Sequence, residues 1–252
     1  MTKFGTPRSR SITSTGILGK AFLTRMWQAR EDLHPIERRG FACFFYVTVC
    51  GHLEAVIADV IKSRLKFVEH AIGWDSLPPM LCTTSAGTED VPIDPISATV
   101  RTMAAALEAE VDTAPLSRLS QLYERVFPKS ISDVLGPGLE ADVKALGALR
   151  NLFAHGRDLT MEFEPASDTV FEGTLDRNAL KSAAQRLHQA GVIPDFNITG
   201  LNYDDFFGRF FGDAALRHFH AVVQEADSRL RGACDFAPER AVAHIQSLPP
   251  LD

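Results

Sequence analysis

The sequence predicts an all-α protein, and three observations support this fold class. Apolar residues recur at spacings of three and four along most of the chain, as on the buried face of a helix. Clusters of Gly and Pro separate these segments. The 252 residues are 45% hydrophobic and 23% charged, which is ordinary for a folded globular protein and excludes collagen-like, low-complexity and disordered chains.

The first helices are expected to build the core bundle. An initial helix over 17–33 precedes an unusually long one over 36–72, and a stretch rich in Pro, Thr and Gly then predicts a surface loop over 73–94. Such a loop could lie over the end of a core helix or cover a substrate groove. The predicted core bundle consists of the helices 36–72, 95–113, 116–127 and 139–156.

Beyond Gly156 we expect a small β-hairpin and further helices. The segments 159–164 and 169–172 alternate apolar and polar residues around a Pro-containing turn, which indicates two short strands. Helices are expected at 176–189, 204–211 and 213–232. The predicted organisation is thus a basic arm over 1–16 and a single helical domain over 17–252, with a core at about 36–158 and a helical C-terminal extension at about 159–252.

Positive charge is concentrated at the start of the chain. The first thirty residues carry Lys3, Arg8, Arg10, Lys20, Arg25 and Arg30 and no acidic residue. Because the net charge of the chain is −6, the remaining residues must sum to −12. Three interpretations remain open: an arm that contacts RNA or another polyanion, an organellar transit peptide, or a solvated tail.

The longest uninterrupted apolar stretch, Phe41 to Cys50, is too short for a transmembrane helix, and His52 and Glu54 follow it. No charged segment followed by an apolar one opens the chain, so no secretory signal is expected. We therefore expect a cytoplasmic protein with no membrane partner. Its four cysteines are too few for a disulfide scaffold, and we expect them to be reduced thiols.

Two further patterns carry weaker indications. The segment 204–211 interleaves aromatic residues with Arg209, as single-strand-binding proteins do, but the pairs Phe206–Phe210 and Phe207–Phe211 are spaced for one helix face. A hydrophobic anchor is the favoured interpretation there. His218 and His220 would point about 200° apart on a helix, so they do not predict a metal site.

The most informative segment is Arg150-Asn151-Leu152-Phe153-Ala154-His155-Gly156, at the end of the helix predicted over 139–156. Asn151 and His155 are one turn apart on one face, and Arg150 borders that face. A helix C-terminus favours protonated imidazole, so His155 could exchange protons near neutral pH with Asn151 orienting its ring. Arg150 supplies a permanent charge and a planar set of donors for phosphate. These groups match the needs of metal-free phosphodiester cleavage, although a structural His at a helix end is the more common case.

This segment resembles the signature of the HEPN superfamily, in which Arg, a polar residue, three variable positions and His lie on the last core helix of a helical bundle. The stand-alone bacterial HEPN proteins are the most similar in layout. The resemblance covers about residues 36–158 and has no counterpart for the extension. Toxins of this superfamily that pair with a nucleotidyltransferase antitoxin commonly carry Tyr two residues after the His, where this chain has Arg157.

The resemblance implies a homodimeric, metal-independent endoribonuclease of the kind found in toxin–antitoxin and antiviral defence systems. It assigns catalysis to Arg150 and His155, with Asn151 orienting the ring, and requires no metal or cofactor. Arg157 is either an RNA phosphate contact or a solvated charge. The implied partners are RNA, a second copy of the chain and, as in toxin–antitoxin systems, an antitoxin or other regulatory protein. The alternative is a non-catalytic HEPN-like module that binds a nucleotide or RNA or serves as a scaffold.

Gly147, inside the same helix, indicates close packing against its backbone, because Gly costs roughly 1 kcal/mol against Ala in a helix interior. A helix of the same chain would explain it. The resemblance instead favours a two-fold dimer in which the two motif helices face each other.

Overall fold

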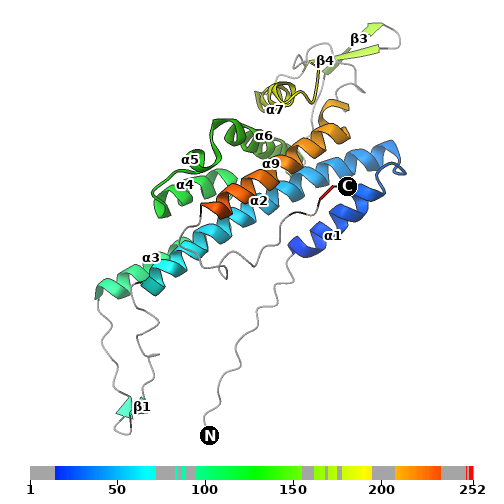
Figure 1. Ribbon diagram of the computed structural model, residues 1–252. Helices are drawn as coiled ribbons and strands as arrows, with labels where there is room; N and C mark the ends of the chain where they lie inside the picture. The colour runs from blue at the N-terminus through cyan, green and yellow to red at the C-terminus, as the bar shows by residue number, and fades with distance from the viewer. Residues whose placement is uncertain are drawn as a thin grey trace.

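The fold is taken from a computed structural model (Figure 1), which describes the backbone of residues 15–71, 83–84, 87–88, 95–154, 162–167, 170–174, 178–194, 208–233, 248 and 250–251. The structure is mostly helical, which confirms the all-α class. Most of the predicted basic arm and most of the loop predicted over 73–94 lie outside the described residues.

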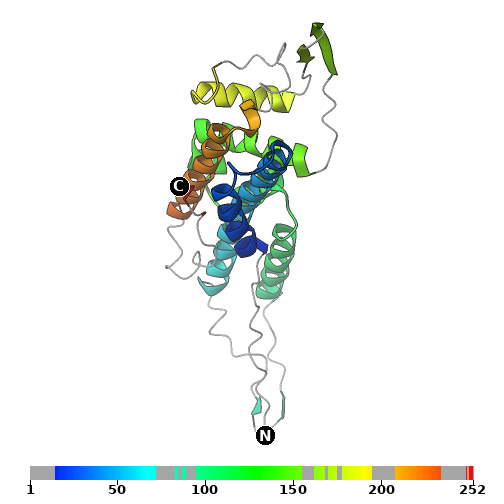
Figure 2. The same ribbon diagram turned by 90° about the vertical axis from the view of Figure 1, so that its right-hand side faces the viewer.

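The helices are α1 (Thr15–Gln28), α2 (Pro35–Ala71), α3 (Pro95–Val111), α4 (Leu116–Val126), α5 (Ile131–Leu135), α6 (Pro137–Ala154), α7 (Asn178–Gln189) and α9 (Asp213–Gly232). Two short antiparallel pairs accompany them: β1 (Thr83–Thr84) with β2 (Gly87–Thr88), and β3 (Glu162–Ser167) with β4 (Val170–Thr174). In Figure 2, α7 with β3 and β4 lies at one end of the molecule, and β1 and β2 lie at the other.

The core is organised around α2, which packs against α1, α3, α4, α6 and α9. Phe45 and Tyr46 on α2 are fully buried, and a ridge of aliphatic side chains continues from them along the helix. Tyr46 also donates its hydroxyl hydrogen to the carbonyl oxygen of Phe210, which satisfies the polar end of a buried ring. A helix that is covered on several sides explains the long apolar pattern of this segment.

The last long helix belongs to this core. Phe45 lies against His220, and His52 lies against Asp227, so the same seven-residue advance on both helices shows that α9 runs parallel to α2. Figures 1 and 2 show the two helices side by side. The segment predicted as an extension therefore supplies one of the main partners of α2.

By length and composition, α2 is also the only helix of the described residues that could cross a membrane, because an 18-residue window within Pro35–Lys66 has a mean hydropathy of 1.7. The sequence-based expectation that no helix spans a membrane is based on the uninterrupted apolar stretch Phe41 to Cys50. An average over a longer window stays apolar even when it includes His52 and Glu54. In the structure, 56% of its apolar window is buried by other helices, as in the core helix of a bundle.

The short helix α5 was not predicted from the sequence. Its five residues are too few for a periodic apolar pattern. A capping box begins it, because the Ser130 side chain accepts a hydrogen bond from the Asp133 N–H and the Asp133 carboxylate accepts one from the Ser130 N–H. Gly136, at a φ of 75°, ends the helix, and Pro137 then begins α6.

Candidate functional site

Arg150 lies in the last turns of α6 and faces α2. Its Nη2 lies 3.4 Å from Oε2 of Glu54, and its Nη1 donates a 3.0 Å hydrogen bond to Oδ1 of Asn151. The side chains of Arg150 and Glu54 are 24% and 17% exposed, so solvent reaches the pair. The guanidinium is thus held in place but remains accessible from one side.

Glu54 is the residue of this site that the sequence analysis did not identify as functional. Its second oxygen, Oε1, accepts a 3.1 Å hydrogen bond from the N–H of Leu116 at the start of α4. One carboxylate therefore connects α2, α4 and α6. The only signal in the sequence was a negative charge in the middle of the most apolar helix, since 96 residues separate Glu54 from Arg150.

Arg150 also has an unused donor. Its Nε atom is buried and has no hydrogen-bond partner among the residues that the structure describes. Buried polar groups are almost always hydrogen-bonded, so an unsatisfied guanidinium nitrogen is a point at which a further acceptor would be stabilised. A phosphate oxygen or a neighbouring side chain of this chain are both suitable acceptors.

Cys50 lies one turn before Glu54 on α2 and is buried. Burial, together with the nearby Glu54 carboxylate, raises the pKa of the Cys50 thiol to about 12, although Arg150 acts in the opposite direction. The thiol is therefore protonated at neutral pH and cannot act as a nucleophile. Cys50 and Cys43 are both free cysteines, in agreement with the reduced thiols expected from the sequence.

Asn151 is exposed at the surface of α6. Because its side-chain oxygen accepts from Arg150, its amide nitrogen is the group left to contact another residue or a ligand. His155 and Arg157 lie outside the described residues, as does Gly156. The structure thus brings Arg150 and Asn151 together, and the predicted contact between Asn151 and His155 stays a prediction.

The close packing predicted at Gly147 is found within the chain. A Cβ atom at this position would lie 3.1 Å from Cδ2 of Leu116 on α4, which is closer than most such contacts. The small residue at Gly147 is therefore explained by the packing of α4 on α6. It no longer provides evidence for a dimer contact, and the dimer stays an inference from the family resemblance.

Histidines and acidic residues elsewhere form ion pairs in the core. Asp142 on α6 accepts hydrogen bonds of 2.7 and 3.0 Å from Arg186 on α7, and His218 on α9 lies 3.8 Å from the same carboxylate. Among the described residues, no group of three or more His, Cys, Asp or Glu side chains is placed to hold a metal ion.

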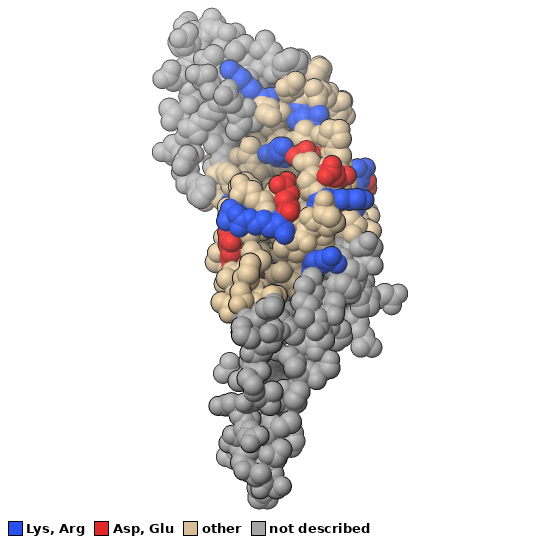
Figure 3. Space-filling model, turned by 90° about the vertical axis from the view of Figure 1, so that its left-hand side faces the viewer, with Lys and Arg blue, Asp and Glu red and all other residues tan. Residues whose placement is uncertain are grey.

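The charge on the surface is mixed. On the face drawn in Figure 3, Lys and Arg side chains are interspersed with Asp and Glu side chains. Such a face does not supply the uniform positive potential that attracts nucleic acid regardless of sequence. Any phosphate recognition on that face would depend on individual arginines.

The chemical resources at the end of α6 are thus a fixed guanidinium with an unused donor, an exposed amide and a supporting carboxylate. Comparisons with models of protein families, with curated proteins and with solved structures find nothing that matches this chain.

Proposed function

We propose that the protein is a metal-independent endoribonuclease whose chemical pair is Arg150 and His155. The observation that carries the proposal is the position of the Arg150 guanidinium. Its Nη2 lies 3.4 Å from Oε2 of Glu54, and about a quarter of the Arg150 side chain is exposed. A fixed cation with an open side stabilises a charged transition state at no cost of reorganisation. The resemblance to the HEPN signature supplies the role of His155.

In the proposed reaction, the neutral imidazole of His155 accepts the proton of a ribose 2′-hydroxyl. The 2′-oxygen then attacks the adjacent phosphorus, and the bond to the 5′-oxygen of the next nucleotide breaks. Arg150 stabilises the charge that develops on the phosphate oxygens, and an imidazolium donates a proton to the leaving 5′-oxygen. The products are a 2′,3′-cyclic phosphate and a free 5′-hydroxyl, so atoms and charge balance without a metal.

The remaining proposals follow from the same resemblance. A homodimer would bring two Arg150–His155 pairs to one cleft, and the second His155 would supply the imidazolium. We propose a cytoplasmic toxin or phage-defence effector, which an antitoxin or other regulatory protein would hold inactive.

Mixing Arg150→Ala subunits with His155→Ala subunits tests the proposed dimer. Recovered cleavage would show that one site takes Arg150 from one subunit and His155 from the other. Continued inactivity of a mixture that forms dimers would mean that both pairs are required together, and an active monomer would exclude either arrangement.

The direct test is cleavage of end-labelled RNA in EDTA. The wild type should cut, whereas His155→Ala and Arg150→Ala should lose about 100-fold or more of the rate. Arg125→Ala is the matched control, because Arg125 is an exposed arginine on α4 and should leave the rate unchanged. A cyclic phosphate end and loss of cleavage at a single 2′-deoxy position would support the mechanism. Dependence on added metal, or cleavage that survives His155→Ala, would reject it.

A second candidate function is a non-catalytic module that binds RNA or a nucleotide, or serves as a scaffold. The ion pair between Arg150 and Glu54 favours it, because the same contact would stabilise the packing of α6 on α2 without any catalysis. Under this alternative, no RNA is cut. Arg150→Ala and Glu54→Ala would then lower only the free energy of unfolding, Glu54→Ala by more because it also removes the acceptor of the Leu116 N–H.

A further inference from the structure

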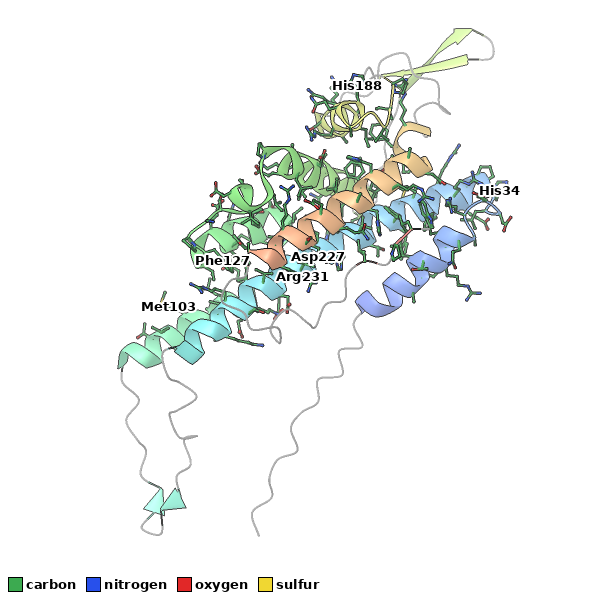
Figure 4. All side chains as sticks on the ribbon, in the orientation of Figure 1. His34, Met103, Phe127, His188, Asp227 and Arg231 are labelled. Carbon is green, nitrogen blue, oxygen red and sulfur yellow. The ribbon has the colours of Figure 1, made fainter. Side chains whose placement is uncertain are left out.

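A surface pocket lies where α2 begins and where the chain enters α9. It has a volume of about 380 Å³ and is lined by Leu33, Pro35, Arg38, Arg39, Gly208, Phe211 and Gly212. In Figure 4, His34 marks the start of α2, at the same end of the molecule as the start of the orange helix α9. The volume is within the range of small-ligand sites.

One side of this pocket is positively charged. Arg38 donates from Nε to the carbonyl oxygen of Arg30 at 3.1 Å and from Nη2 to that of Glu31 at 2.9 Å. Both acceptors are uncharged, so these hydrogen bonds fix the guanidinium without neutralising it. Arg39 follows on the same wall. Arg39 already makes a contact of its own, so Arg38 supplies the guanidinium for a phosphate.

The acidic residue nearest to the start of α9 does not cancel this charge. Asp213 accepts a 2.7 Å hydrogen bond from Nε of Arg30, a residue that does not line the pocket. The residue before it, Gly212, carries no side chain that could cap the first N–H groups of α9. The dipole of this helix therefore adds to the attraction for an anion beside Arg38.

The opposite side is apolar and aromatic. Phe211, Leu33 and Pro35 provide it, and Phe211 belongs to the aromatic segment whose pattern resembled single-strand-binding proteins. Its neighbour Phe210 is fully buried, so of these two described rings one is an anchor and the other lines the pocket. A ligand that fits has a flat or apolar part beside an anionic part, which is the chemistry of a nucleotide.

The pocket also adjoins the helix that carries the motif. The ring of Phe211 lies 5.3 Å, centroid to centroid, from that of Phe153, which is three residues beyond Arg150 on α6. A nucleotide in this pocket therefore lies next to the end of α6. We infer that the pocket binds one nucleotide of a single-stranded RNA, with its phosphate on Arg38 and its base or sugar against Phe211; this inference rests on the proposed function.

The test uses two glycines that are matched in their surroundings. A Cβ atom added at Gly208, on the pocket wall, or at Gly40, on α2 outside the lining, would meet no atom within 4 Å among the described residues. Gly208→Glu thus introduces a carboxylate at the pocket with little strain, and Gly40→Glu introduces the same charge elsewhere. Gly212 is unsuitable, because a Cβ there would lie 2.4 Å from the carbonyl oxygen of Gly208.

Binding of a fluorescein-labelled oligouridine to the full-length chain is measured by fluorescence anisotropy, with folding checked by circular dichroism. Gly208→Glu should raise Kd by about tenfold or more through repulsion of the phosphate, while Gly40→Glu should stay within about twofold of the wild type. Arg38→Gln should weaken binding and reduce its salt dependence. Equal Kd values for the two glycine variants would overturn the inference.

A second arm separates RNA from a free nucleotide. If AMP binds in a manner that Gly208→Glu weakens, whereas oligouridine binding is unaffected, the pocket is a site for a free nucleotide and the inference about RNA is wrong. Wild-type cleavage of the same RNA in EDTA is assayed in parallel. If the wild type cuts RNA but the two glycine variants have equal Kd values, the inference about the pocket is rejected and the proposed function is kept. If binding is weakened by Gly208→Glu but the wild type cuts no RNA, the pocket is kept and the proposed nuclease function is rejected.

Discussion

Two polar side chains on α2, His52 and Glu54, lie two residues apart and therefore point to opposite sides of the helix. His52 faces α9, where its Nε2 lies 3.4 Å from Asp227, and the two side chains are only 3% and 4% exposed. Glu54 faces α6, where its contact with Arg150 is of the same length but several times more exposed. Similar distances thus describe one sealed contact and one that a ligand can reach.

The sealed contact on the α9 side involves three side chains rather than two. Asp227 also forms an ion pair with Arg231, one turn further along α9, and Figure 4 labels both residues on that helix. Charges that are removed from water need several hydrogen bonds to offset the cost of desolvation, and the two partners of Asp227 provide them. The comparison indicates that the α2–α9 contact serves stability, whereas the α2–α6 contact stays accessible to solvent.

The largest effect is expected from Asp227→Ala, which leaves His52 and Arg231 without their carboxylate. We expect the free energy of unfolding to fall by about 3 to 5 kcal/mol, as measured by urea denaturation. Glu225→Ala is the matched control, because Glu225 and Arg229 form an ion pair with the same spacing on α9 but are 53% and 46% exposed. Its loss should be about 0.3 to 0.5 kcal/mol. Equal losses for the two variants would contradict the comparison.

The same contact predicts a dependence on pH. Burial opposes ionisation of Asp227, but hydrogen bonds from His52 and Arg231 outweigh it, and the pKa of the carboxyl is lowered. The stabilisation is therefore complete above the unfolded pKa, near 4, and is lost as the pH falls through the lower folded pKa. The stability difference between the wild type and Asp227→Asn should shrink accordingly in urea titrations from about pH 7 to about pH 2. A difference that is constant over this range would contradict the assignment.

A smaller effect is expected at the exposed contact. Glu54→Ala removes the acceptor of the Leu116 N–H and the partner of Arg150, and should cost about 1 to 3 kcal/mol in urea denaturation. Glu54→Gln keeps an acceptor for Leu116 and should cost less. If the proposed function is correct, Glu54→Ala also lowers the cleavage rate by about tenfold or more, because Arg150 loses its fixed position. Unchanged stability and rate in Glu54→Ala would show that Glu54 does not position Arg150.

The smallest effect is expected for Gly147→Ala. The gain in helix propensity, roughly 1 kcal/mol, opposes the tight contact with Leu116, whose side-chain end can shift, so the free energy of unfolding should change by less than about 1 kcal/mol. The sedimentation coefficient should be unchanged, because the neighbour of Gly147 belongs to the same chain. If Gly147→Ala lowered the sedimentation coefficient but not the free energy of unfolding, Gly147 would be part of a dimer interface.

The sequence predicted the helices well wherever the signals were local. The bounds of α4 and α9 agree within a residue of the predicted 116–127 and 213–232, because an apolar period and nearby Pro or Gly residues mark both ends. The long helix α2 begins and ends within one residue of its prediction for the same reason. The five residues of α5 depend on a capping box, which the helical period does not reveal.

The contacts of the candidate site were much less predictable. Arg150 and Asn151 could be identified because they are adjacent in the sequence, but Glu54 is brought to them only by the packing of α6 on α2. The pairing of His52 with Asp227 joins residues 175 positions apart. In the sequence, His52 stands out only as a polar residue after an apolar stretch, and nothing local indicates that a carboxylate would lie opposite.

The parallel packing of α2 and α9 has a consequence for the newly made chain. Asp213 begins α9 142 residues after Ala71 ends α2. At typical rates of translation, α9 therefore emerges from the ribosome roughly 7 to 30 seconds after α2 is complete. During that interval the apolar face that α9 will cover is open to solvent.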